Sequence, residues 1–416
     1  MRDHVTKQAR RAKEASRKLA LLSGGERNEA LSAMADALEA RQAEILEVNE
    51  REVATAREKS VRQNMIDRMI LTLKRIADMA EGIRQVATLP DPLEKVDFDI
   101  TRPNGLKIRR VRVPFGVVGI VYESRPNVTA DAIALCLKSG NACVLRGGSE
   151  VVRTNKKIVD IMREAAVAHG VPEKAVEFIS ILDRDAVVVM CRLRKLIDVI
   201  IPRGGAGLIT RVIEHSTVPV IETGTGICHT FVDATADLDM ALKICMNAKT
   251  QRPSVCNAME TLLIHRDVAE KFLPKVSQAM IDTGVELRGD ETCRKIFPDM
   301  KEATENDWAT EYNDLILSVK IVDDLDAAIE HINRYNTEHS DAIITSDKNS
   351  ATRFENLVDA AAVYVNASTR FTDGFEFGFG AEIGISTQKM HVRGPMGLEA
   401  LTTMKYFIEG DGQIRG

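Results

Sequence analysis

The chain has 416 residues, of which 44% are hydrophobic and 28% charged, with a formal net charge of −5. A domain usually has about 100 to 200 residues, so this length predicts two or three domains. The mixed charges with a small acidic excess argue against nucleic acid or an anionic membrane as a partner. No stretch approaches the roughly 18 uninterrupted apolar residues of a membrane span, and the N-terminal run LALL is too short for a signal peptide.

The seven cysteines contain no C-x-x-C pair, and the eight histidines show no H-E-x-x-H or comparable ligand spacing. An odd number of scattered cysteines predicts neither a disulfide framework nor a zinc cluster. We therefore expect a cytoplasmic protein with reduced thiols and no metal centre.

The first 90 residues are predicted to be helical. Segment 24–59 contains no proline, and the apolar residues of the next segment recur at steps of three and four, which is the pattern of a core-facing helix. This apolar stripe consists of Met65, Met69, Leu73, Ile76, Met79, Ile83 and Val86.

A β-hairpin is predicted next, over residues 96–114. Val96, Phe98 and Ile100 alternate with polar residues, Asn104-Gly105 supplies a turn, and alternation resumes at Leu106.

From Gly116 onward, short apolar segments alternate with amphipathic ones. This alternation predicts parallel sheets covered by helices on both faces. A first series of strands is expected before about residue 230 and a second after it, with a hinge near ETGTGICH, so we predict two α/β domains. The expected strands are 116–122, 141–146, 175–180, 196–201 and 218–222, then 259–265, 314–322, 341–346 and 361–366.

Ligands of such sheets bind at the carboxyl ends of the strands, so the loops there carry the candidate site residues. Gly204 and Gly205 follow one strand and permit close approach to a phosphate or ribose, although an ordinary tight turn explains them equally well. In VLRGGSE, Arg146 suits an anionic ribose-phosphate, and Ser149 serves as a ligand contact, a helix cap or both. Asn127 in YESRPN is either an oxyanion donor or a helix cap.

Cys256 lies in TQRPSVCNAMETLLIH, between a predicted helix and a predicted strand. A thiol in a loop that enters a buried strand is held by the sheet and open to a cleft, which suits a nucleophile. The other cysteines are expected to pack as small hydrophobes.

Five blocks in order carry a resemblance over nearly the whole chain: RVPFGVVGIVYESRPN, ETGTGICHTFVD, RPSVCNAMETLLIH, GFGAEIGISTQKMHVRGP and EGDGQIR. On these blocks the chain resembles the γ-glutamyl phosphate reductases, a family of the aldehyde dehydrogenase superfamily. The resemblance implies an α/β aldehyde dehydrogenase-like fold with two parallel-sheet domains and a β-hairpin oligomerisation arm. The implied parts are an NADP-binding domain over 1–95 and 115–226, a catalytic domain over 227–392, and the arm over 96–114 and 393–416.

The resemblance also implies a reaction, namely NADPH-dependent reduction of L-glutamate 5-phosphate to L-glutamate 5-semialdehyde with release of phosphate. The reaction passes through a cysteine thioester and belongs to proline biosynthesis. A homo-oligomer is implied, with functional coupling to the kinase that makes the acyl phosphate.

Site residues follow from the matched motifs. Cys256 matches the nucleophile and Asn127 the oxyanion donor. Glu222 falls where hydrolytic relatives keep a water-activating base, which this reaction does not need, and we group it with the coenzyme site. The other implied coenzyme contacts are Arg146, Ser149, Glu150, Gly204, Gly205 and the ribose-contacting Glu311, with Arg146 and Ser149 predicted to favour NADPH through its 2′-phosphate.

Three arginines are candidates for the phosphate or α-carboxylate of the substrate, because a guanidinium forks onto either anion. They are Arg125, Arg252 and Arg370, and ordinary ion pairs are the alternative for each; Arg252 is also placed to assist the thiolate. Two other functions stay open, a hydrolytic or CoA-acylating aldehyde dehydrogenase and a catalytically silent scaffold. Cys256 and Asn127 argue against the scaffold.

Overall fold

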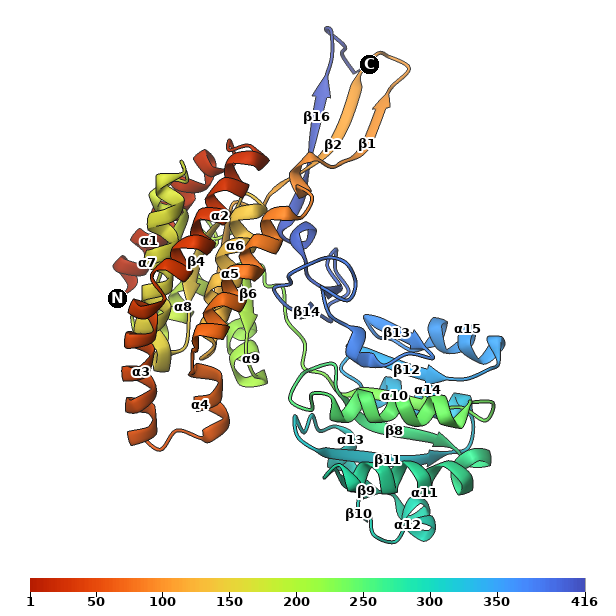
Figure 1. Cartoon of the computed structure of the whole chain (residues 1–416). Coiled ribbons are helices and arrows are strands. Elements are labelled where there is room, and N and C mark those ends of the chain that lie inside the picture. Colours follow the sequence, from red (N-terminus) through yellow and green to blue (C-terminus); the bar gives the residue numbers. More distant parts are fainter. Residues whose placement is uncertain (416) are drawn as a thin grey trace. The chain divides into compact units, whose positions relative to one another are not determined.

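The computed structural model describes residues 1–415 and divides into two compact units (Figure 1). Unit 1 comprises Met1–Thr223, Gly378–Gly384 and the chain from Met396 onward. Unit 2 comprises Gly224–Phe377 and Ile385–Pro395. The unit boundary at Thr223 falls within the segment ETGTGICH.

Unit 1 begins with five helices: α1 Arg2–Leu19, α2 Gly24–Ala40, α3 Gln42–Glu58, α4 Gln63–Met69 and α5 Leu73–Thr88. Ser23 and Glu26 form a capping box that starts α2. The helical prediction for this region is confirmed, but the single stripe over 65–86 is wrong in one respect. The chain leaves the helix at Ile70, Thr72 caps α5 by accepting the Arg75 N–H at 3.2 Å, and Leu73 is exposed.

The parallel sheet of unit 1 has the strand order β5-β4-β3-β6. Its strands are β3 Val117–Tyr122, β4 Ala142–Arg146, β5 Val176–Phe178 and β6 Val199–Arg203. The intervening helices are α6 Pro126–Lys138, α7 Val152–Ala168, α8 Asp185–Cys191 and α9 Ala206–His215, with single turns η2 Ser149–Val151 and η3 Glu173–Ala175. The strand expected at 218–222 is reduced to one bridge, between Ile200 and Val220.

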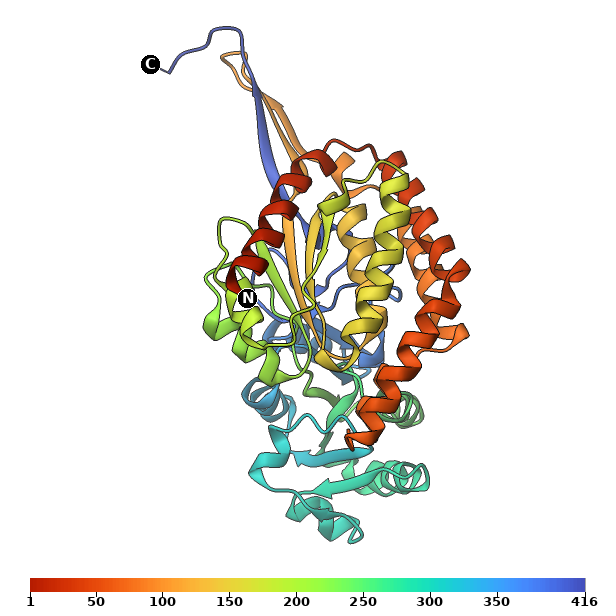
Figure 2. The ribbon, with the colours of Figure 1, turned by 90° about the vertical axis from the view of Figure 1, so that its left-hand side faces the viewer.

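Helices cover both faces of this sheet (Figure 2). α1 crosses β3, β4 and β5 on one face and packs beside α8, whereas α6 and α7 cover the other. α2, α3 and α5 form a further layer over α6 and α7. β3 and β4 are therefore buried along their whole length, which explains their unbroken apolar sequences.

A three-stranded antiparallel sheet extends from one end of unit 1 (Figure 1). We call it the arm; it consists of β1 Val96–Thr101, β2 Lys107–Pro114 and β16 Thr402–Glu409, in the order β1-β2-β16. Gly105 occupies the turn with φ +86°, a conformation that favours glycine. The predicted hairpin is confirmed, and the C-terminal strand pairs with it from Thr402 opposite Pro114 to Glu409 opposite Lys107. The short helices η1 Pro92–Glu94 and η5 Leu398–Leu401 lead into the arm.

Unit 2 is built on a seven-stranded parallel sheet of order β10-β9-β11-β8-β7-β12-β13. The strands are β7 Cys228–Val232, β8 Met259–His265, β9 Glu286–Gly289, β10 Lys301–Glu302, β11 Ile316–Val322, β12 Ser340–Ile344 and β13 Ala362–Val365. The helices are α10 Leu238–Thr250, α11 Arg266–Asp282, α12 Glu291–Ile296, α13 Glu305–Trp308, α14 Leu325–Tyr335, α15 Lys348–Leu357 and the turn η4 Thr369–Phe371. β14 Ile385–Ser386 and β15 Gly394–Pro395 form a separate small pair.

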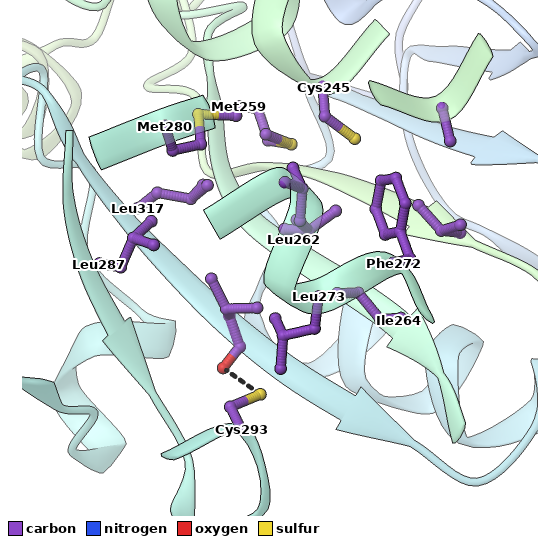
Figure 3. Packing of buried hydrophobic residues seen from close by; sticks show 14 of the residues in the cluster. Cys245, Met259, Leu262, Ile264, Phe272, Leu273, Met280, Leu287, Cys293 and Leu317 are labelled. Carbon is purple, nitrogen blue, oxygen red and sulfur yellow. Dashed lines mark hydrogen bonds between the residues drawn. The ribbon is translucent and has the colours of Figure 1, made fainter. Parts of the chain in front are cut away.

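Two apolar clusters fix the helices of unit 2. One cluster packs α10, α11 and α12 against the sheet around Leu262, Phe272 and Leu317 (Figure 3). The other packs α14 and α15 through Ile329 and Phe354. Two helix-covered parallel sheets and a hairpin arm are therefore present, as the sequence predicted.

Candidate functional site

Cys256 lies in the loop between α10 and β8, as the sequence predicted. It is partly exposed, whereas the other six cysteines are buried. β8 is buried along its whole length, so the loop is fixed at the strand end. A thiol that is anchored and still accessible suits a nucleophile.

Arg370 braces the Cys256 loop on both sides. Its Nε donates to Gln251 Oε1 at 2.8 Å, and its Nη1 donates to Asn257 Oδ1. Asn257 is further tied by donating Nδ2 to the Thr372 carbonyl at 2.9 Å and by accepting a hydrogen bond from Thr369 Oγ1 at its own carbonyl, at 2.7 Å. Arg370 thus binds neutral amides and takes part in no carboxylate ion pair within residues 1–415.

Positive charge surrounds this loop. Burial lowers the pKa of Arg370, and the charge of Arg252 lowers it further, whereas a thiolate at Cys256 acts in the opposite direction. Arg252 is exposed, and it forms no ion pair with any side chain that the structure describes. Arg370 and Arg252 thus bring two positive charges to this loop, and guanidinium groups suit an anionic ligand.

The backbone of Cys256 packs against the segment that leads into β7. A Cβ atom at Gly226 would lie 1.5 Å from the Cys256 carbonyl oxygen, so only glycine fits. The buried Cys228 donates its S–H to the same oxygen at 3.2 Å, and burial raises the pKa of Cys228 well above its usual value, which keeps it a thiol. Glu311, the predicted ribose contact, accepts the Gly226 N–H at 2.8 Å and so positions this segment.

A buried ion pair lies behind the loop and was not foreseen from the sequence. Lys249 in α10 donates to Glu260 in β8 at 2.6 Å, and the two side chains are 0% and 1% exposed. Burial raises the pKa of Glu260 to about 7 and lowers that of Lys249. Glu260 also accepts the Asn313 N–H at 3.1 Å, so the pair joins α10, β8 and the chain before β11.

Asn127 lies in the first turn of α6, in unit 1, and does not cap the helix. The N-cap residue is Arg125, which makes no side-chain cap hydrogen bond. Asn127 Nδ2 instead donates to Asp131 Oδ2, one turn further along, at 3.3 Å. The cap interpretation is therefore wrong, and the amide has a second N–H for a ligand. The spacing of four residues on a predicted helix was the signal that would have identified Asp131.

The turn after β4 is organised around Arg146. This side chain is only 7% exposed and donates to the carbonyls of Gly147 at 2.5 Å and Leu182 at 3.1 Å. Glu150 accepts from Ser124 at 2.9 Å and Ser149 at 3.1 Å, which turns its carboxylate toward these hydroxyls. Ser149 opens η2 and does not cap α7.

Internal carboxylates occupy two helix starts that the sequence associated with a nucleotide. At α7, Glu52 accepts the N–H groups of Arg153 and Thr154 at 2.8 and 2.9 Å. At the start of α9, Glu123 accepts the Gly205 N–H at 2.9 Å, and a Cβ at Gly204 would lie 2.6 Å from its carboxyl carbon. With Glu123 in this position, a side chain at 204 would meet its carboxyl group, so the contact with Glu123 explains a glycine there without a ligand.

The predicted residues divide between the two units. Unit 2 brings together Cys256, Arg252, Arg370 and Glu311. Unit 1 contains the remaining predicted residues: Arg125, Asn127, Arg146, Ser149, Glu150, Gly204, Gly205 and Glu222, the last directly before the unit boundary.

Two further searches concern residues 1–415. No group of three or more histidine, cysteine, aspartate or glutamate side chains there is arranged to hold a metal ion. Over the same residues, every helix is too short or too polar to cross a membrane.

Comparison with known proteins places this geometry in a family. The aldehyde dehydrogenase family model matches residues 1–294. The gamma-glutamyl phosphate reductase of Moorella thermoacetica is 58% identical over 411 residues, covering 99% of this chain and 98% of that protein. The enzyme of the same name from Carboxydothermus hydrogenoformans is 58% identical over 414 residues and covers 100% of both chains.

Solved structures show the same family relationship. The crystal structure of gamma-glutamyl phosphate reductase from Thermotoga maritima is 50% identical, has a TM-score of 0.97 and covers 99% of this chain and 100% of that chain. An acetylating aldehyde dehydrogenase from Geobacillus thermoglucosidasius has a TM-score of 0.70 at 17% identity, covers 100% of this chain and 98% of that chain, and so shares the fold alone.

Proposed function

Because the chain belongs to the gamma-glutamyl phosphate reductase family of aldehyde dehydrogenases, we propose that it reduces L-glutamate 5-phosphate to L-glutamate 5-semialdehyde with release of phosphate. This places it in proline biosynthesis. The observation that carries the proposal is Cys256, a partly exposed thiol in a loop that Arg370 holds and that also contains Arg252. The chain that contains this loop is similar to these reductases over its whole length.

The first half of the reaction uses Cys256 and Asn127. The thiolate attacks the carbonyl carbon of the acyl phosphate, and the Asn127 amide donates to the oxyanion that forms. Collapse of this intermediate breaks the carbon–oxygen bond to phosphate, which leaves with the bonding electrons. A thioester on Cys256 remains, and we assign the departing phosphate to Arg252, an exposed cation four residues before Cys256.

When bound, a nicotinamide coenzyme would supply the hydride that reduces the thioester carbonyl. The resulting thiohemiacetal expels the Cys256 thiolate and releases the aldehyde. Water must stay away from the thioester, so a general base at Glu222 is not required.

The edge of the unit 1 sheet fits such a coenzyme. The order β5-β4-β3-β6 places the turns after β4 and β6 on either side of β3, at one carboxyl edge. Arg146 has a buried Nε without a hydrogen-bond partner among the described residues, and Ser149 and Glu150 follow in the same turn. We propose that Arg146, Ser149, Glu150, Gly204 and Gly205 bind NADPH, with Glu222 and Glu311 contributing, although Glu123 must leave Gly205 before a phosphate binds there.

Arg125 and Arg370 complete the proposed substrate site as contacts for its phosphate or α-carboxylate. We further propose a cytoplasmic homo-oligomer assembled through the arm and functionally coupled to the kinase that makes the acyl phosphate. The six buried cysteines and the partly exposed Cys256, none of which forms a disulfide within residues 1–415, suit a reducing compartment.

The test is NADPH oxidation with the acyl phosphate made in place by a glutamate kinase and ATP. The wild-type enzyme should oxidise NADPH only when the kinase is active, and Cys256→Ala should abolish turnover while binding NADPH normally. Steady-state reduction by the alanine variant would exclude the thioester route. A requirement for CoA would instead favour the acylating alternative.

A further inference from the structure

The proposed mechanism assigns no role to Asp131, whose carboxylate lies beside the oxyanion donor Asn127. Both residues lie in α6, and their spacing of four places them on one face of the helix. Asn127 Nδ2 donates to Asp131 Oδ2 at 3.3 Å. With Asn127 as the oxyanion donor of the proposed function, Asp131 lies beside the substrate carbonyl.

The surroundings of Asp131 suit a cationic ligand. Burial raises the pKa of Asp131 to about 6, against the opposing effects of the Asn127 amide and the charge of Arg203. The side chain still reaches solvent in part, and it forms no ion pair with any side chain that the structure describes. A partly desolvated carboxylate whose hydrogen-bond partner is a neutral amide gains most from a charged donor.

Arg203, the nearby cation, is held elsewhere. A Cβ at Gly384, where φ is +147°, would lie 2.6 Å from Arg203 Nη1, so the guanidinium packs on the backbone there. Its charge helps to keep Asp131 ionised at neutral pH, but it leaves the carboxylate oxygens without a cationic partner.

The substrate has a cation at a matching distance. An oxyanion bound to Asn127 Nδ2 lies about 2.9 Å from that nitrogen, and Asp131 lies 3.3 Å from the same nitrogen, so the two are within roughly 6 Å of each other. In an extended γ-glutamyl group, the α-nitrogen lies about 5 Å from the reacting carbonyl carbon by standard bond lengths. The ammonium group can therefore reach Asp131 while the carbonyl is on Asn127.

We propose that Asp131 binds the α-ammonium group of the substrate and so selects amino-acid derivatives over simple acyl phosphates and aldehydes. The proposal rests on the proposed function and adds the group that recognises the amine.

The experiment runs the reaction in reverse, with NADP, phosphate and one of two aldehydes, at one pH above the pKa of Asp131. L-Glutamate 5-semialdehyde carries the ammonium group, and 5-oxopentanoate is the same chain without it. Wild type, Asp131→Asn and Asp131→Ala are compared, with Asp36→Asn as a matched control, since Asp36 is a surface acid of unit 1 paired with Arg84. Cyclisation of the semialdehyde is the same for every variant and does not alter their ratios.

Both Asp131 variants should lower kcat/KM for the semialdehyde by about 10- to 100-fold, mainly through KM, because a charged partner of the substrate is lost. Their kcat/KM for 5-oxopentanoate should stay within about threefold of wild type. Equal losses on both aldehydes, or a loss in kcat alone, would show that Asp131 only orients Asn127 and would overturn the proposal. Oxidation of neither aldehyde by wild type would instead defeat the proposed function, and the proposal with it.

Discussion

Asn127 is a residue at which catalysis can be tested separately from helix stability. Its amide donates to Asp131 and makes no cap, so its removal should leave α6 intact. Loss of one oxyanion donor typically lowers the rate by about 100- to 1000-fold. Asn127→Ala should therefore lower kcat of the forward reaction by that factor, with NADPH affinity measured by fluorescence titration nearly unchanged. A folded variant with normal kcat would remove Asn127 from catalysis.

Asp131 gives the reaction a pH dependence. Its pKa is raised to about 6, so the free enzyme loses this negative charge as pH falls through that value. KM for the semialdehyde should then rise, approaching tenfold per pH unit at lower pH, while KM for 5-oxopentanoate should not follow the same curve. KM profiles for both aldehydes measure this, and Asp131→Asn should remove the inflection. An inflection that persists in this variant must belong to another group.

At the scale of single residues, motifs placed Cys256 and Asn127 in the loop and helix turn where the structure has them. The carboxylates that accept hydrogen bonds at the starts of α7 and α9 could not be predicted from the sequence. Glu52 and Glu123 come from distant segments, and no local sequence pattern marks them. Asp131 was within reach, since its spacing from Asn127 is a local property of a helix.

At the scale of elements, long periodic segments were predictable and their interruptions were not. Met69 and Ile76 are spaced as if they lay in one continuous helix. The chain nevertheless breaks between α4 and α5, and Thr72 caps the start of α5. β7 was missed because CHTFV interrupts its apolar residues with His229 and Thr230, which are both fully buried. Asp341 of β12 accepts from His229 Nδ1 at 3.1 Å, and such a tertiary pair has no signature in the sequence of either strand.

The ion pair between α10 and β8 sets the stability of the element that carries Cys256. Lys249→Met leaves the Glu260 carboxylate buried without its cation and should lower the free energy of unfolding by about 3 to 5 kcal/mol. Urea denaturation of unit 2 fluorescence, which reports on Trp308, measures this loss. The double variant Lys249→Met/Glu260→Leu should recover much of it, since no buried charge remains. A single-variant loss below about 1 kcal/mol would contradict this account.

At the scale of the whole molecule, the arm presents an apolar face. Phe98, Tyr406 and Ile408 are 39%, 56% and 62% exposed, and together with Ile100, Ile108 and the two arginines Arg102 and Arg110 they line one hollow of this sheet. An exposed patch of this kind is typical of an interface. Ile408→Asp should shift the proposed oligomer toward monomer in light scattering after size exclusion. Lys405→Ser, a change on the other face of β16, is the control, and an unchanged mass for Ile408→Asp would place the interface elsewhere.

The central claim is that phosphate, and not water or CoA, exchanges with the Cys256 thioester. Microscopic reversibility then requires phosphate to release the acyl group when the semialdehyde reduces NADP. The decisive measurement is the initial rate of NADP reduction as phosphate or arsenate is added to a phosphate-free buffer. We predict a rate that rises from near zero and saturates, and that survives in Glu222→Gln. A full rate without phosphate that collapses in Glu222→Gln would identify a hydrolytic aldehyde dehydrogenase and contradict the account.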